Sequence, residues 1–267
     1  MVTRRAARSR WSRPVCGSTA SGKRSRGTLM QPSSEALFDV LSASRAVLFD
    51  FDGPICDVFR GLSAPSVAEE LAELVAQQAP HLGERARATD DPMEVHRISE
   101  EGGTALLGAV EEALAAAELR AVKAAGAPVE GAVQALHAAG DAKRRVAVVS
   151  NNSAACVIEF LTINGLADVV AEVVGRPSLR PRLMKPAPYP LLAAANALGV
   201  DPTEAVLVGD AVTDVEAAKA AGARSIGFAN KPLKWSALAD AGADAIVSDM
   251  QAVADVLINL GFSDRRA

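Results

Sequence analysis

The chain has 267 residues, a formal net charge of −4, 49% hydrophobic residues and only 4% aromatic residues. This size and composition predict one large α/β domain, or a core with a smaller insert, whose interior consists mainly of Ala, Val, Leu and Ile. No apolar run is long enough to cross a membrane. The cysteines, Cys16, Cys56 and Cys156, form neither a metal-binding nor a disulfide pattern, which favours the cytoplasm over secretion.

Residues 1–30 differ in composition from the rest of the chain. They contain eight basic residues and no acidic one, which predicts a disordered basic tail, or a start of translation that really lies at Met30. A targeting role is less favoured, since the tail lacks the apolar segment of a secretory signal. The other 20 basic and 32 acidic residues give the remainder a formal charge of −12. Nucleic acid is therefore not an expected partner.

The first predicted strand covers residues 46–49, within the sequence RAVLFDFDGPICD that begins at Arg45. Asp50 and Asp52 would project to the same side beyond its carboxyl end, where open α/β sheets bind ligands. Two carboxylates this close favour a bound cation or a shared proton. Mg²⁺ would bridge one of them to a phosphate group. The alternative is a solvated turn, since Asp and Gly are common turn residues, and the DxDG pattern taken alone is only a moderate signal.

Residues 57–127 have Ala, Leu and Glu at helical spacing, which predicts a compact helical bundle. The polar residues of this segment that could contact a ligand are Arg60, His81 and His96, but each of them is expected at the surface. Lys123 falls in an Ala-rich helix and is expected to be solvated.

A second predicted strand, 145–149, ends at Ser150, Asn151 and Asn152 and leads into a helix at 154–163. Hydroxyl and amide groups at this position can donate hydrogen bonds to phosphate oxygens beside a helix N-terminus. The same residue types also cap helices without binding any ligand. Taken alone, the capping interpretation is favoured.

A strand predicted at 169–174 precedes a loop that is rich in cations. Lys185 is suited to offset the charge that two acids and a phosphate group would create. The arginines of this loop are expected to form a solvated face: Arg176, Arg180 and Arg182.

The predicted strand 205–208 again ends in acids. Asp210 lies where a metal ligand would be needed, and Asp214 follows in the first turn of the next helix, a position that favours acids even without a metal. Two more strands, 225–228 and 243–247, complete six strands that alternate with helices. This order predicts a three-layer, Rossmann-like parallel sheet. No GxGxxG or GxxxxGK[ST] motif accompanies it, so binding of nicotinamide, flavin or P-loop nucleotides is not favoured.

Four sequences occur in a fixed order: FDFDGP at 49–54, VVSNNS at 148–153, KPAP at 185–188 and LVGDAVTD at 207–214. Together they resemble the four motifs of the haloacid dehalogenase superfamily of phosphotransferases. The resemblance implies an α/β core at 31–56 and 128–267, with an α-helical cap at 57–127 that closes over the active site.

The resemblance also implies a Mg²⁺-dependent phosphatase for a small phosphorylated metabolite. In that mechanism Asp50 attacks phosphorus and forms an aspartyl-phosphate, while Asp52 protonates the leaving oxygen and then activates water. The resemblance implies that the metal is held by Asp50, the main-chain oxygen of Asp52, and Asp210, with Asp214 in support. It also implies that the phosphoryl group is bound by Ser150, Asn151 and Lys185.

Other functions remain open on the sequence. A dehalogenase needs no acid two residues after the nucleophile, so Asp52 counts against that activity. A phosphomutase would keep every motif, and a non-catalytic ligand-binding or interaction protein is the alternative from another class. Sugar phosphates, phosphoglycolate and nucleoside monophosphates all suit a helical cap, and the oligomeric state has no signal in the sequence.

Overall fold

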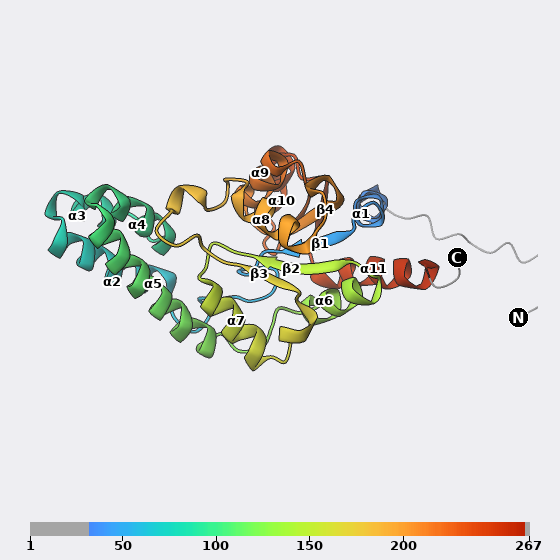
Figure 1. The fold of residues 1–267 in the computed structure, drawn as a ribbon, viewed down its shortest axis with the longest axis horizontal. Helices are drawn as coiled ribbons and strands as arrows, with labels where there is room; N and C mark the ends of the chain where they lie inside the picture. The colour runs from blue at the N-terminus through green and yellow to red at the C-terminus, as the bar shows by residue number, and fades with distance from the viewer. Residues whose placement is uncertain (1–31, 265–267) are drawn as a thin grey trace, which may run out of the picture. The chain divides into compact units, whose positions relative to one another are not determined.

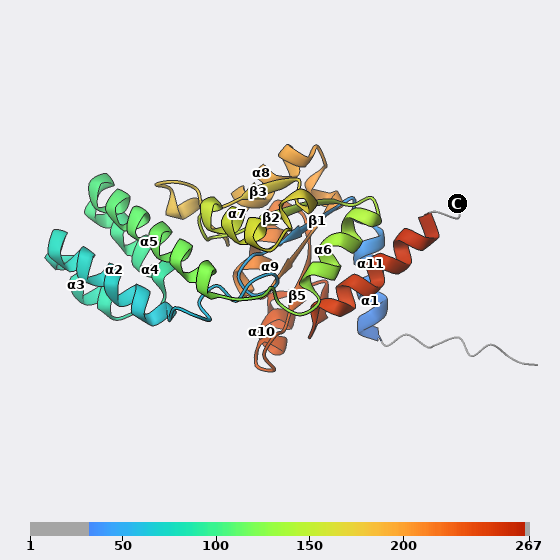
Figure 2. The same ribbon diagram turned by 90° about the horizontal axis from the view of Figure 1, so that it is seen from below.

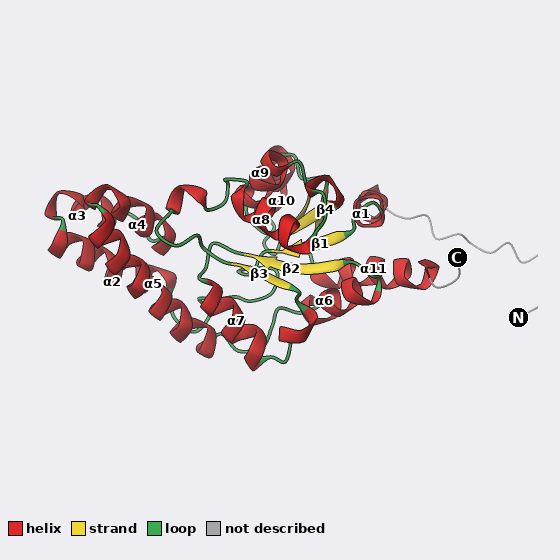
Figure 3. Ribbon diagram, viewed as in Figure 1, coloured by secondary structure: helices red, strands yellow, loops and turns green. Residues whose placement is uncertain are grey.

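The computed structural model describes residues 32–264, so the predicted basic tail lies outside the described residues. A six-stranded sheet forms the centre, with all neighbouring strands parallel, in the order β3-β2-β1-β4-β5-β6. All six strands that the sequence predicts are present. Figure 3 shows strands of the sheet in yellow with helices in red around them. Their bounds are β1 Ala46–Phe49, β2 Arg145–Val149, β3 Glu172–Val174, β4 Ala205–Gly209, β5 Arg224–Phe228 and β6 Ala245–Val247.

Helices cover both faces of the sheet (Figure 1). Alternate residues of β1 pack on opposite sides, Val47 and Phe49 in one apolar cluster and Ala46 and Leu48 in another, as the period of two in an extended chain requires. The predicted three-layer α/β fold is therefore confirmed. The first face carries α1 Pro32–Ser42, α6 Ala132–Asp141, α7 Ala154–Ile163 and α11 Met250–Asp264, and the second carries α8 Tyr189–Leu198, α9 Val212–Ala221 and α10 Lys234–Ala241.

The central strand β1 is buried along its whole length, as its apolar sequence predicts. Leu48 lies opposite Ala147 of β2 and Leu207 of β4, so the three strands run in step. Because parallel strands end at the same edge of a sheet, the residues that follow β1, β2 and β4 come together there. These are the residues that carry three of the four motifs.

Helices also fill the segment between β1 and α6, and Figures 1 and 2 both show them to one side of the sheet. They enclose a separate apolar cluster that includes Leu71, Val95 and Leu114. Among the described residues, no helix is long and apolar enough to cross a membrane. The bounds in this segment are α2 Ala64–Gln78, α3 Pro80–Arg87, α4 Pro92–Ser99, the 3₁₀ helix η1 Glu100–Gly102 and α5 Thr104–Ala124.

Some predicted boundaries are wrong. Residues Ala167–Val169 form a 3₁₀ helix, so β3 begins only at Glu172. Helix α6 begins only at Ala132, because Gly131 has a positive φ of 81° that an α-helix cannot include.

Candidate active site

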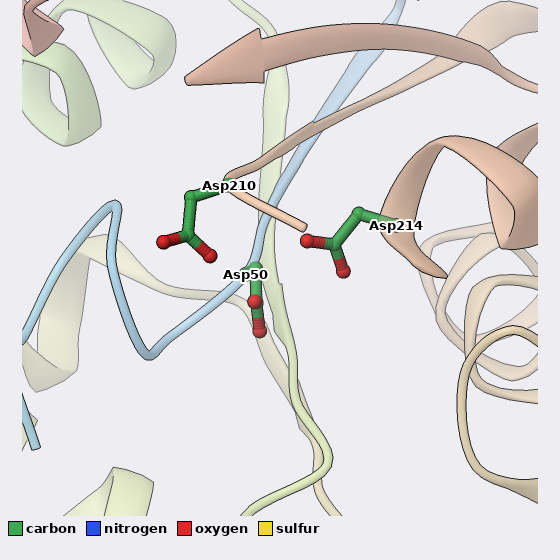
Figure 4. Close-up of side chains that lie close together, drawn as sticks. All are labelled: Asp50, Asp210 and Asp214. Atoms are coloured by element: carbon green, nitrogen blue, oxygen red, sulfur yellow. The ribbon is translucent and has the colours of Figure 1, made fainter. Parts of the chain in front are cut away.

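Three carboxylates meet at the carboxyl edge of the sheet (Figure 4). Asp50 follows β1, Asp210 follows β4, and Asp214 lies in the first turn of α9. One carboxylate oxygen from each lies within 4.8 Å of the other two. The structure thus brings together two of the predicted metal ligands and the residue predicted to support them.

Lys185 lies between two of these acids. Its ammonium Nζ is 2.7 Å from Asp50 Oδ1 and 2.6 Å from Asp214 Oδ1, and it also donates a hydrogen bond of 3.2 Å to the Val149 carbonyl. The Lys185 side chain is almost fully buried. A buried ammonium is stable only beside opposite charge, so Lys185 and the acids stabilise one another.

Two glycines make room for the acids. A Cβ added at Gly53 would lie 2.3 Å from Asp210 Cγ, and one at Gly209 would lie 2.4 Å from Asp214 Cγ. Gly53 also has a φ of 108°, which disfavours other residues. The glycines in the first and fourth motifs therefore have steric roles at the site.

Two acids of the cluster, Asp50 and Asp210, have a raised pKa. Burial raises the pKa of Asp50 well above its usual value, and the charges of Asp214 and Asp210 add to this effect while Lys185 opposes it. Burial also raises the pKa of Asp210, against the effect of Lys234. Such a site gains from any further positive charge.

Asp52 stands beside this cluster but not in it. Its Oδ1 accepts a hydrogen bond of 3.0 Å from the Val58 main-chain N–H. Burial, followed by the charge of Asp210, raises its pKa to about 6, although the Val58 hydrogen bond acts in the opposite direction. A carboxyl with this pKa can give or take a proton near neutral pH.

The predicted phosphate-binding residues lie next to Lys185. Ser150 is buried, and its Oγ donates a hydrogen bond of 3.2 Å to Asn152 Oδ1. The Asn151 side chain bonds the main chain of Lys185 twice, accepting from its N–H at 2.9 Å and donating to its carbonyl at 3.2 Å. The second and third motifs are thus fixed to each other.

Asp210 has two partners that the sequence analysis missed. Asn230 Nδ2 donates a hydrogen bond of 3.1 Å to Asp210 Oδ2, and Lys234 Nζ pairs with the same oxygen. Both partners follow β5, in a segment that shows no chemical pattern in the sequence. Only the sheet order, which places β5 beside β4, brings them to the site.

Two cavities adjoin the acids, and Asp52 and Asp210 line both. One, of about 330 Å³, is lined by Asp50, Ser150, Lys185 and other groups of the sheet edge, and by residues of the helical insertion. The other, of about 550 Å³, lies on the side of Arg60, Asn230, Lys231 and Lys234. We assign the chemistry to the smaller cavity, because it contains the cluster with its buried lysine.

Two expectations of surface exposure are wrong. The side chain of Arg176 is buried because it pairs with Glu118 of α5, the Arg176 Nη1 to Glu118 Oε1 distance being 2.7 Å. His96 is fully buried, with its Nε2 3.6 Å from Glu111 Oε2. Burial and the charge of Arg176 lower the pKa of His96 to about 4, so its ring is neutral near pH 7. The remaining positions predicted to be exposed, His81, Lys123, Arg60, Arg180 and Arg182, are exposed.

The pairing of Glu118 had one signal in the sequence. Glu118 lies four residues after Leu114 and three before Ala121, both buried, so it falls on the apolar face of its helix. An acid on such a face needs a buried partner. The partner itself, 58 positions further along the chain, carries no comparable signal.

A family model described as haloacid dehalogenase-like hydrolase matches residues 44–222. A phosphoglycolate phosphatase of Rhodospirillum rubrum is 32% identical over 230 residues, which cover 80% of this chain and 90% of that protein. A phosphoglycolate phosphatase of Xylella fastidiosa is 29% identical over 212 residues, covering 72% and 86%. The crystal structure of CbbY from Rhodobacter sphaeroides in complex with phosphate shares the fold, with a TM-score of 0.58, 18% identity and coverage of 78% and 95%.

Proposed function

Because the chain belongs to the haloacid dehalogenase-like hydrolase family and is a phosphatase, we propose that it uses Mg²⁺ and hydrolyses a small phosphorylated metabolite through an aspartyl-phosphate on Asp50. One observation carries this proposal. The Asp50 carboxylate contacts a buried lysine and lies within 4.8 Å of two further carboxylates.

The donor set fits a hard divalent cation. Three carboxylates share the edge of the sheet with one buried ammonium, and hard cations such as Mg²⁺ prefer oxygen ligands. Asp50, the main-chain oxygen of Asp52, and Asp210 would hold Mg²⁺, with Asp214 in support. When bound, Mg²⁺ neutralises charge on the phosphoryl oxygens during transfer.

In the first step, an Asp50 oxygen attacks phosphorus while the bond from phosphorus to the leaving oxygen breaks. Asp52 gives its proton to that oxygen, and its pKa of about 6 suits this role. In the second step, Asp52 takes a proton from water, which attacks the aspartyl-phosphate, releases inorganic phosphate and restores Asp50.

The other predicted residues bind and orient the phosphoryl group. Lys185 offers its ammonium beside Asp50, and Ser150 and Asn151 line the same cavity. Positioned donors of this kind stabilise charge that develops in the transition state. The adjoining insertion would act as the cap, since Phe59 and Met93 form part of the cavity wall and would exclude water.

We take 2-phosphoglycolate as the first substrate to test. Two relatives of this chain are phosphoglycolate phosphatases that match most of its length. A cavity of about 330 Å³ lies at the small end of the usual range for ligand sites, which suits a compact ester.

The test is release of inorganic phosphate from 2-phosphoglycolate, sugar phosphates and nucleoside monophosphates, with Mg²⁺ or with EDTA. We expect turnover only with Mg²⁺, and a loss of at least about a thousandfold in Asp50→Asn, which keeps the side-chain size but removes the nucleophile. Asp240→Asn, at an exposed acid of α10, is the control.

Equal rates in the wild type and Asp50→Asn would refute the assigned nucleophile. Phosphate that appears on a second hydroxyl instead of in solution would identify a phosphomutase. A wild type without turnover on the whole panel would favour a binding protein.

A further inference from the structure

Glu118 of α5 and Arg176 of the loop after β3 form a buried ion pair behind the candidate active site. Their side chains are 0% and 1% exposed. Arg176 Nη1 lies 2.7 Å from Glu118 Oε1, and Nη2 lies 3.4 Å from Oε2. Burying two charges costs free energy that their mutual attraction often only balances, so stability alone is a weak reason for such a pair.

Both members of the pair bond the loop that follows β2. Glu118 Oε1 accepts a hydrogen bond of 3.3 Å from Asn152 Nδ2, and its Oε2 accepts one of 2.9 Å from the Ser153 main-chain N–H. Arg176 Nη1 donates to the Asn151 carbonyl at 3.0 Å. The main-chain N–H of Arg176 also donates to the Asn152 carbonyl at 2.8 Å. Three consecutive residues of the loop are therefore held by one ion pair.

The same loop carries the groups assigned to phosphate. Asn152, held by Glu118, accepts from Ser150 Oγ through its Oδ1 and donates its main-chain N–H to that Oγ at 3.0 Å. Asn151, whose carbonyl bonds Arg176, fixes the main chain of Lys185 through its side chain. Short chains of hydrogen bonds thus link the ion pair to Ser150 and to Lys185.

We propose that Glu118 and Arg176 are positioning residues, which hold the loop 150–153 in the conformation that binds the phosphoryl group. The insertion then has a second role besides forming part of the cavity wall. Through Glu118, helix α5 supplies a carboxylate that holds the loop after β2. Only the turnover measurement in the test below rests on the proposed function. The affinity for inorganic phosphate measures the positioning role directly.

The test uses the full chain in Mg²⁺ buffer and compares three properties: calorimetric affinity for inorganic phosphate, kcat and KM for the hydrolysed ester, and the thermal unfolding midpoint. Glu118→Gln keeps the shape of the side chain but places an amide donor against the donors of Arg176 and Asn152. Arg176→Lys keeps the charge but has one ammonium where the guanidinium bonds both Glu118 oxygens and the Asn151 carbonyl. In both variants we expect phosphate to bind at least about tenfold more weakly at a temperature far below the unfolding midpoint.

The control is another ion pair of α5, formed with helix α7, which packs on the sheet. Lys123 Nζ of α5 lies 3.4 Å from Glu159 Oε1 of α7, but these side chains are 61% and 37% exposed and do not reach the loop 150–153. We expect Lys123→Gln to leave phosphate affinity, kcat and KM unchanged. A pair that served only stability would lower the unfolding midpoint in Glu118→Gln without changing phosphate affinity.

Asn152→Ala is the second test if breaking the pair prevents folding. It keeps the ion pair but removes the side-chain hydrogen bonds that join Asn152 to Glu118 and to Ser150, and we expect the same loss of phosphate affinity. Wild-type affinity in folded Glu118→Gln, or in Asn152→Ala where Glu118→Gln does not fold, would overturn the proposal. The two proposals can fail separately. If the wild type hydrolyses no ester but the variants still bind phosphate more weakly, the positioning role is supported and the proposed function fails. A wild type that binds no phosphate would overturn both.

Discussion

Asp52 connects the chemistry to the stability of the fold. Its folded-state pKa of about 6 lies above the usual value of 3.8, mainly because the carboxyl is buried. The folded chain therefore binds this proton more tightly than the unfolded chain does. Stability from this residue is fully present below pH 4 and is lost as the pH rises towards 6 and above.

We expect Asp52→Asn to remove this pH dependence. Between pH 4 and pH 7 the free energy of unfolding of the wild type should fall by about 2 kcal/mol relative to the variant, from a shift of about two pKa units. Urea unfolding of both proteins in EDTA at several pH values measures the difference. A difference that stays constant over this range would show that Asp52 has an ordinary pKa in the folded chain.

The positions of the candidate site residues at the ends of strands were predicted well from the sequence. Asp50, Ser150 and Asp210 each follow a strand, and an apolar run that ends in polar residues is visible without a structure. The residues that surround them were missed. Lys234 and Arg176 reach the site through the order of the strands and the path of a loop, which local patterns do not encode.

At the scale of elements, the turn after β1 depends on Gly53. Gly53→Ala would force Asp210 to move, because the new Cβ would lie 2.3 Å from its Cγ. We expect Mg²⁺ to bind at least about tenfold more weakly, together with a loss of about 1–3 kcal/mol in stability from the strained backbone. Calorimetric titration with Mg²⁺ and urea unfolding measure the two effects.

Gly103→Ala is the matched control for this turn. Gly103 has a similar φ of 89°, but an added Cβ would meet nothing within 4 Å. The control should lose stability from backbone strain and keep its Mg²⁺ affinity. Equal Mg²⁺ affinity in Gly53→Ala and the wild type would mean that Asp210 does not bind the metal, or that the turn adapts.

The elements themselves were predicted more accurately than their ends. Four consecutive apolar residues identify a buried strand, as in β1 and β2, because a parallel sheet is covered on both faces. The predicted start of β3 was wrong because Val169 and Val170 are as apolar as the strand itself. In the structure Val169 still belongs to a 3₁₀ helix. Composition does not distinguish the two.

At the scale of the whole molecule, two apolar clusters lie in different parts of the chain. Leu114 is fully buried among the helices of the insertion, and Leu136 is fully buried against the sheet. The predicted division into a core and a cap at 57–127 implies that the helices around one cluster can unfold locally while the other cluster stays folded.

Leu114→Ala tests that division. The cavity should cost about 2–5 kcal/mol and increase amide hydrogen exchange in α2 to α5 while β1 and β4 stay protected. Leu136→Ala, as the counterpart, should weaken protection across the sheet. If Leu114→Ala raised exchange equally in the strands, the two clusters would form a single cooperative unit and the predicted division would be wrong.

The shared lining of the smaller cavity has a practical consequence. The carboxylates to which we assign the reaction come from the edge of the sheet, whereas Phe59 and Met93 come from the insertion. Selection of a substrate can thus change by mutation at Phe59 and Met93 while the reaction itself is preserved. A library aimed at new phosphate esters would vary these two wall positions and leave Glu118 untouched, so that every member keeps the same catalytic core.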